Sequence, residues 1–275
     1  MTLTNLSDRA VLSVSGSEAR AFLQGLITQD VSRLDAGAIF ACLLTPQGKI
    51  LFDFFIAPAG SDETEKLLVD VAAESADALL KRLKLYKLRA KVEIALADDL
   101  AVYWSPEAAE SLDGALCAFA DPRHAGLGRR IIADPGAAPA GDDYASARIG
   151  VGAPEAGADF NADDVFPLDV NFDALNAVDY KKGCFVGQEV ASRMKRKGEA
   201  RKRTLIALFD GAPPAPGAAV TADGSTLGRI MSGVEGRALA LIRLDRLARA
   251  VDANHAIEAD GKALRLTRPG YLADG

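Results

Sequence analysis

The order of apolar segments along the chain is the feature that most limits how it can fold. Strand-like and helix-like runs follow one another through the first 150 residues, a pattern typical of α+β proteins. Strands are predicted at 9–14, 39–44, 49–56, 66–71, 91–96, 101–104, 115–120 and 129–133, and helices at 21–27, 75–88 and 142–151. Residues 150–164 are rich in Gly, Ala and Asp, so we expect them to form a surface connection.

The last quarter of the chain has a different pattern. From Arg203 onward the apolar runs are all short and are separated by turn residues, with strands predicted at 204–209, 218–221, 225–232, 237–244 and 263–267. This spacing predicts an all-β domain, either a small barrel or a sandwich, that begins near residue 200.

Two local arrangements are also predicted within the first part of the chain. Thr45-Pro46-Gln47-Gly48 lies between two strand-like runs, and its Pro and Gly suit a tight reversal between antiparallel strands. Residues 66–96 read as a strand, a helix and a returning strand.

Composition and charge exclude several classes of protein. With 275 residues and 49% apolar content the chain can bury a sizeable core, and its net charge of -6 is unsuited to a dedicated DNA-binding protein. No apolar run approaches the roughly 18 residues of a membrane span, and the first residues lack the pattern of a signal peptide. We therefore expect a cytoplasmic protein with no membrane partner.

The three cysteines are too far apart in the sequence for a zinc motif. Cys42 and Cys117 lie in apolar strand-like runs, which predicts packing roles for both. Cys184 lies between Gly183 and a predicted helix that starts near Gln188, so its backbone is open to a ligand. The dipole of that helix and the neighbouring lysines favour a thiolate, which makes Cys184 a candidate nucleophile, redox centre or soft-metal ligand, with a buried structural thiol as the alternative.

The segment that contains Cys184 is also strongly basic. Residues 181–203 hold nine Lys and Arg against two Glu, which suits a small anionic ligand, an RNA phosphate track or simply a solvated surface. Residues 193–203 contain no aromatic side chain for base stacking, which argues against nucleic acid.

Other catalytic patterns are missing from the sequence. It has no phosphate-binding Gly-rich loop, no Gly-x-Ser-x-Gly and no paired-His metal motif. The two histidines, His124 and His255, stand alone and are predicted to be surface residues.

One eight-residue stretch resembles a family signature. Lys182-Gly183-Cys184-Phe185-Val186-Gly187-Gln188-Glu189 is similar to the Lys-Gly-Cys-(Tyr/Phe)-x-Gly-Gln-Glu motif of YgfZ-type proteins. Supporting similarity covers nearly the whole chain and occurs in the expected order, at Phe22-Leu23-Gln24-Gly25, Thr45 to Lys49, Leu85 to Arg89, Asp121-Pro122-Arg123 and Leu227-Gly228.

This resemblance implies a fold like the T-protein of the glycine cleavage system. Residues 1–200 would form two ferredoxin-like subdomains plus the Cys-motif segment, and residues 201–275 a C-terminal β-barrel. It also implies tetrahydrofolate or a derivative as a ligand, and a role in assembly or repair of iron-sulfur clusters. The expected partners are the iron-sulfur assembly machinery or client iron-sulfur enzymes.

The resemblance also assigns expected roles to residues. Cys184 would be the reactive residue, Gly183 and Gly187 would give access to it, and Gln188 and Glu189 would order the loop. Lys182 and Arg193 would favour the thiolate or contact anionic groups. One motif cysteine cannot supply the four thiolates of a cluster, so no stably bound metal is expected.

The folate contacts are predicted from polarity next to apolar runs, and the candidates are Gln47, Asp53, Arg89 and Asn171. Two other functions stay open. An aminomethyltransferase would follow from the T-protein resemblance, and an RNA-binding accessory protein would follow from the basic stretch.

Overall fold

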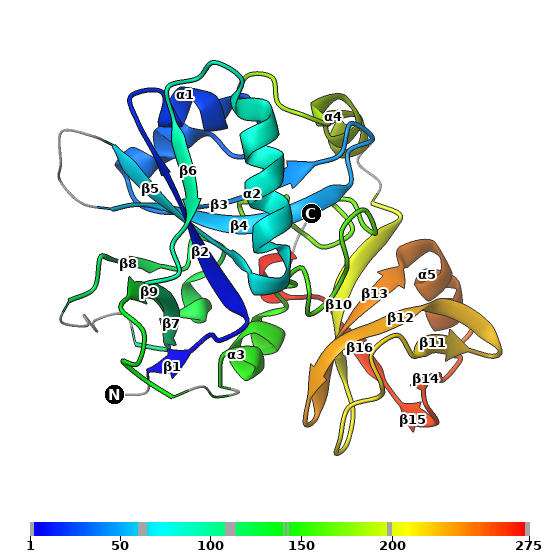
Figure 1. Cartoon of the computed structure of the whole chain (residues 1–275). Helices are drawn as coiled ribbons and strands as arrows, with labels where there is room; N and C mark the ends of the chain where they lie inside the picture. Colours follow the sequence, from blue (N-terminus) through cyan, green and yellow to red (C-terminus); the bar gives the residue numbers. More distant parts are fainter. Residues whose placement is uncertain are drawn as a thin grey trace.

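Three antiparallel β-sheets organise the protein (Figure 1). The structure is a computed structural model that describes residues 3–59, 65–107, 114–139, 141, 143–196 and 200–272. The first sheet has the order β3-β4-β5-β2-β6. Its strands are β2 (Arg9–Ser15), β3 (Ile39–Leu44), β4 (Ile50–Pro58), β5 (Lys66–Ala72) and β6 (Glu93–Leu96).

Two helices cover one face of this sheet. Helices α1 (Ala19–Gln24) and α2 (Ala73–Lys87) bury Leu23, Leu79 and Leu83 against the side chains on that face. β2 is antiparallel to both β5 and β6, so it lies between the two strands that α2 connects. The predicted strand-helix-strand unit therefore exists, but β2 splits it.

The second sheet has the order β1-β7-β9-β8 and lies on the other side of the first. Its strands are β1 (Thr4–Asn5), β7 (Ala101–Ser105), β8 (Cys117–Ala120) and β9 (Arg129–Ala133), and helix α3 (Asp143–Val151) follows them. Short 3-10 helices occur at Val31–Asp35, Ala125–Leu127 and Gly270–Leu272.

The third sheet contains the C-terminal strands, in the order β15-β14-β11-β12-β13-β10-β16. They are β10 (Lys202–Leu208), β11 (Ala219–Ala222), β12 (Ser225–Val234), β13 (Arg237–Arg243), β14 (Ile257–Ala259), β15 (Lys262–Ala263) and β16 (Arg265–Thr267). Helix α5 (Leu244–Asp252) packs on β12 and β13. Neither α5 nor β14 was predicted from the sequence.

Buried ion pairs join the first two sheets. Arg130 of β9 is fully buried, and its Nη1 lies 2.6 Å from Oδ2 of Asp70 on β5. Asp70 also accepts from Nε of Arg9 at 2.6 Å, and Arg123 lies 2.7 Å from Glu155. Burial alone would raise the pKa of Glu155, but attraction to Arg123 and Arg130 lowers it well below its usual range.

These contacts correct the prediction for residues 150–164. Glu155, Asp159 and Phe160 are only 4%, 7% and 4% exposed, so this segment does not simply run over the surface. Its acidic residues are buried because Arg123, Arg130 and Arg148 compensate their charge.

Replacing Arg130 with Met should destabilise the fold strongly. The change leaves buried carboxylates short of a cation, which costs about 3–5 kcal/mol of unfolding free energy in comparable sites. Urea denaturation followed by circular dichroism measures it. Arg229→Met is the control, because Arg229 pairs with Asp164 at a half-exposed position and its loss should cost at most about 1 kcal/mol. Equal losses in the two variants would contradict a special role for the buried pairs.

Candidate functional site

The segment around Cys184 is anchored by a buried lysine. Nζ of Lys182 donates to the carbonyl oxygens of Gln24, Ile27 and Gln29 at 2.8, 2.7 and 2.9 Å. The side chain is 6% exposed, and burial lowers the pKa of Lys182 to about 8. An ammonium has three N–H groups, and all three are used here. Lys182 therefore holds the loop against the end of α1, and its N–H groups bond to carbonyl oxygens.

A second anchor is the contact between Gly187 and the β3–β4 hairpin. Gly187 has φ +80, and a Cβ there would lie 2.5 Å from the carbonyl oxygen of Thr45. Gly48 in the hairpin turn has φ +83, and a Cβ there would lie 2.9 Å from Cβ of Val190. Because neither glycine has a Cβ, the segment 182–189 can lie in direct contact with the β3–β4 turn. Gly187 is therefore needed for this contact, whereas Gly183 has open space around it.

Cys184 itself points to solvent between these anchors. It is exposed, whereas the next residue, Phe185, is buried with 7% exposure. The ring centroid of Phe185 lies 5.5 Å from Nζ of Lys182. Helix α4 (Gln188–Arg196) begins four residues later. Within the described residues the side chains of Gln188, Glu189 and Arg193 form no hydrogen bond or ion pair, so the loop is ordered by Lys182, Phe185 and Gly187 instead.

The other two cysteines differ from Cys184. Cys42 is fully buried on β3 and Cys117 is half-buried on β8. Burial raises the pKa of the Cys42 thiol, and raises that of Cys117 to about 12. Both lie against the apolar core, as predicted. Cys184 is thus the cysteine that a partner molecule can reach.

The four predicted folate contacts do not come together in one site. Gln47 is exposed in the hairpin turn, and Arg89 is exposed beyond the end of α2. Asn171 is buried beside β10, where its Nδ2 donates to the carbonyl of Thr204 and to the hydroxyl of Tyr271. Of the four, only Asp53 lies on the face of the first sheet that packs against the second sheet.

The environment of Asp53 is unfavourable for a carboxylate. Its Oδ2 accepts from the backbone N–H of Ala156 at 3.2 Å, while Oδ1 is buried and has no hydrogen-bond partner among the residues that the structure describes. Burial raises the pKa of Asp53 to about 6. The folded state therefore binds the proton more tightly than the unfolded chain. The stability that protonated Asp53 contributes is present below about pH 4 and is lost as pH rises through about 6.

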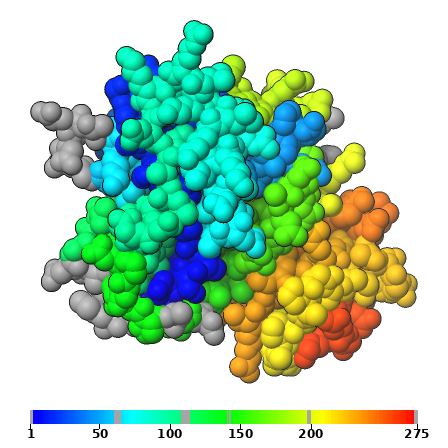
Figure 2. All heavy atoms as spheres, viewed as in Figure 1, coloured from blue at the N-terminus to red at the C-terminus, as the bar shows by residue number. Residues whose placement is uncertain are grey.

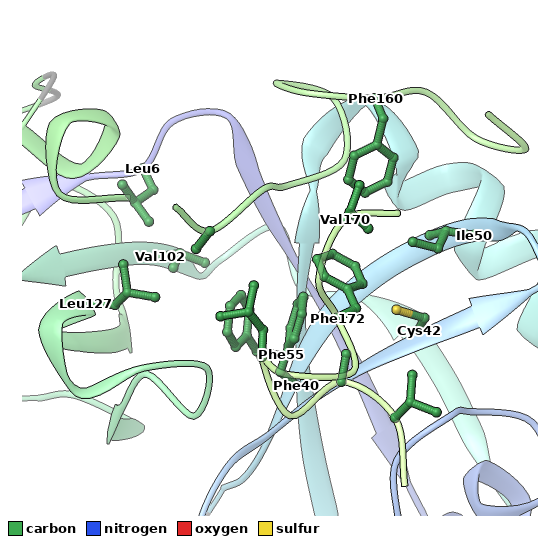
Figure 3. Close-up of a cluster of buried hydrophobic side chains, with 14 of the residues drawn as sticks. Leu6, Phe40, Cys42, Ile50, Phe55, Val102, Leu127, Phe160, Val170 and Phe172 are labelled. Atoms are coloured by element: carbon green, nitrogen blue, oxygen red, sulfur yellow. The ribbon is translucent and has the colours of Figure 1, made fainter. Parts of the chain in front are cut away.

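Aromatic side chains surround this face of β4. Phe55 follows Asp53 on the same face, and its ring centroid lies 4.9 Å from that of Phe40, which in turn lies 5.0 Å from that of Phe172 (Figure 3). The pterin ring of a folate presents N–H donors, which match a buried carboxylate oxygen, and a flat face that suits aromatic neighbours. The unpartnered oxygen of Asp53 suits a pterin N–H group. The rings of Phe40 and Phe55 are each only 1% exposed, and the guanidinium of Arg130 already lies 3.9 Å from the Phe55 centroid. Gln47 and Arg89 lie elsewhere.

Two further expectations concern metals and membranes. Among the described residues no group of His, Cys, Asp and Glu is arranged to hold a metal ion. His124 accepts from the N–H of Gly126, and His255 lies 3.8 Å from Asp223. In the same part of the chain no helix has the length and apolar character needed to cross a membrane.

Lys182→Met should weaken the fold and loosen the loop. Three carbonyl oxygens lose their donor, and each unsatisfied buried acceptor costs about 1–3 kcal/mol. Reaction of Cys184 with a thiol reagent should become faster at low urea, and the urea midpoint should fall. Lys181→Met is the matched control, because Lys181 is exposed, and it should change neither quantity. If both variants behave alike, Lys182 does not anchor the loop.

Comparison with known proteins places this geometry in context. Residues 201–274 match the family model of the CAF17 C-terminal beta-barrel domain. The crystal structure of glycine cleavage system aminomethyltransferase T from Bartonella henselae superposes with a TM-score of 0.75 over 98% of this chain and 86% of that one, at 16% identity. The predicted fold, a T-protein-like α+β region followed by a small β-barrel, is confirmed.

In sequence, this chain is more similar to two other relatives than to that aminomethyltransferase. Iron-sulfur cluster assembly factor IBA57 homolog of Pyricularia oryzae is 31% identical, and the match covers 88% of this chain and 72% of the relative. Iron-sulfur cluster assembly factor IBA57 of Homo sapiens is 32% identical, with 88% and 77% covered. Both relatives are named mitochondrial proteins, which contradicts the cytoplasmic location predicted above.

Proposed function

The chain belongs to the IBA57 family of iron-sulfur cluster assembly factors, and we propose that it acts in iron-sulfur cluster assembly through the thiolate of Cys184. The names of the relatives support a role in iron-sulfur cluster assembly. The similarity of residues 182–189 to the YgfZ-type motif supports the choice of residue.

One observation carries this proposal: Cys184 is exposed on a loop that is fixed at both sides. Lys182 holds one side to the end of α1, and Gly187 rests on the hairpin turn. Because the loop is already ordered, binding at its thiol loses little conformational entropy. Soft thiolate is also the side chain that iron in a cluster prefers.

In this proposal the cluster is cargo, and a second protein supplies most of its ligands. A cluster is usually held by four thiolates, and Cys184 supplies one. In the proposed step the Cys184 thiol loses its proton and forms an S–Fe bond. A thiolate of the donor protein leaves the same iron and takes up a proton. The exchange involves no net oxidation or reduction, and the partners are iron-sulfur assembly machinery or client iron-sulfur enzymes.

Cys184→Ala should abolish cluster binding that depends on the exposed thiol. The purified protein is incubated anaerobically with ferrous iron, sulfide and glutathione, whose thiol can stand in for the partner's ligands. Visible absorption and circular dichroism then detect protein-bound cluster. Wild type and Cys117→Ala should give the same signal, because Cys117 is half-buried on β8, and Cys184→Ala should give almost none. Equal signals from all three proteins would exclude Cys184 as the ligand.

Tetrahydrofolate binding is a second proposal, carried by the unpartnered Oδ1 of Asp53. In this proposal Asp53 accepts from the N–H groups of the pterin ring. A bound tetrahydrofolate supplies a carrier for one-carbon groups. An aminomethyltransferase activity has support from the fold alone, at 16% identity.

The RNA-binding alternative has less support. Asp173 pairs with Lys195 at 2.9 Å and with Arg203 at 2.5 Å, so part of the basic stretch is already neutralised within the protein. Fewer free cations leave less counterion release to drive binding to phosphates.

Calorimetric titration with folinic acid should give saturable binding to wild type and to Cys184→Ala. Asp53→Asn should bind at least about tenfold more weakly, because the carboxylate that pairs with the pterin donors is lost. The same variant should be more stable than wild type at neutral pH, and this difference should shrink below about pH 4, where Asp53 is protonated. Absence of heat with wild type, or undiminished binding by Asp53→Asn, would remove folate from the proposal.

A further inference from the structure

The C-terminal end of α2 exposes two leucines that the core does not use. Helix α2 buries Ala76, Leu79 and Leu83 against the first sheet. Leu85 and Leu88 lie off that face and are 67% and 89% exposed. We call the surface formed by Lys81, Lys84, Leu85, Lys87, Leu88 and Arg89 the α2 tip.

Leu88 occupies a backbone conformation that disfavours it. It is the C-cap of α2, with φ 46 and ψ -104. Positive φ is uncommon for residues with a Cβ, and helices usually place Gly at such a position. The exposed side chain gains no burial in return. Folding therefore gives no reason for Leu88, and strain of this kind is typical of sites with a function.

The α2 tip also gathers unpaired positive charge on an acidic protein. The six cations between positions 81 and 91 are Lys81, Arg82, Lys84, Lys87, Arg89 and Lys91. No acidic residue occurs from 78 to 92, and none of the six side chains has an ion pair within the described residues. The helix dipole accounts for Lys84 and Lys87 in the last turn, where cations are favourable. The dipole does not account for Lys81, Arg82, Arg89 or Lys91.

We propose that the α2 tip is a docking surface for the iron-sulfur protein that exchanges a cluster with Cys184, and that this partner presents an acidic surface with an apolar socket. The inference rests on the proposed function. The end of α2 and helix α4, which follows Cys184, lie at the same end of the molecule (Figure 1). Side chains of this part of α2, coloured teal, project at that end (Figure 2).

The cations and the two exposed leucines of the α2 tip define the chemistry expected of the partner. Acidic side chains complement the cations and speed association, while an apolar socket that covers Leu85 and Leu88 gives the contact its stability. Because Cys184 supplies one ligand, the other ligands must come from a protein that docks at this end. A membrane surface would meet only two apolar side chains here, which favours a protein.

The test uses a defined probe because the partner is unidentified. The probe is a fluorescein-labelled helical peptide of Glu and Leu, compared with the same peptide carrying Ser for Leu. Wild type should bind the Glu/Leu peptide saturably, and the Ser peptide about tenfold more weakly. Raising the ionic strength from about 50 mM to about 300 mM should weaken binding further, because exposed charges are screened.

Variants separate docking from folding. Leu88→Gly and Leu85→Ser should each bind the peptide about tenfold more weakly, and the pair Lys84→Glu with Lys87→Glu should lose binding. The melting temperature of Leu88→Gly should equal or exceed that of wild type, because Gly tolerates the backbone conformation. Val251→Ser is the matched control, since Val251 is 58% exposed on α5, and it should bind like wild type.

Several results would overturn the proposal. These are no saturable binding by wild type, equal binding by the leucine variants, or a large fall in the melting temperature of Leu88→Gly. Stronger Leu88-dependent binding to vesicles of phosphatidylglycerol and phosphatidylcholine would assign the α2 tip to a membrane instead.

The glutathione-supported cluster signal should be unchanged in Leu88→Gly. Loss of that signal in wild type with intact peptide binding would refute the role of Cys184 and leave the docking surface standing.

Discussion

The buried contact of Arg130 with Asp70 and Glu155 is the interaction on which the rest of the structure depends. These charges are removed from water, so each is tolerated only while the others stay in place. Asp70 belongs to the first sheet and Arg130 to the second, and Glu155 belongs to the segment that follows α3. The network therefore fixes the relative position of the two sheets, and it also fixes where the chain after α3 begins.

That fixed start determines where Cys184 lies. The chain continues through Phe172 into the core, and Ala177 and Asp179 bond to Thr28 in the segment between α1 and β3. Three residues later Lys182 reaches the carbonyl oxygens around the end of α1. Cys184 can be exposed and still be held in place because every anchor is a buried contact of its neighbours. A T-protein-like scaffold thus supports a thiol presented at its surface.

Some of this could be predicted from the sequence, and the reasons differ from residue to residue. Local patterns predicted β3 at its observed bounds and the Thr45–Gly48 turn, because strand alternation and turn chemistry are properties of neighbouring residues. The motif drew attention to Cys184, which the structure places at the surface. The roles of Lys182 and Gly187 were missed, because their partners are 153 to 158 residues away for Lys182 and lie in a distant turn for Gly187. Arg130 likewise pairs with Asp70 across 60 positions, and no local pattern reports such a partner.

The positions that folding physics explains least well are informative about function. Asp53 keeps a buried oxygen without a partner, and Leu88 combines a strained backbone with an exposed apolar side chain. A sequence selected only for stability would replace both, for example with Asn and Gly. In the two proposals a bound folate satisfies the first, which lies in the core, and a docked protein covers the second, which lies at the surface. In the same proposals Cys184, on a loop with neither defect, is the reactive group, and the three positions can be altered independently.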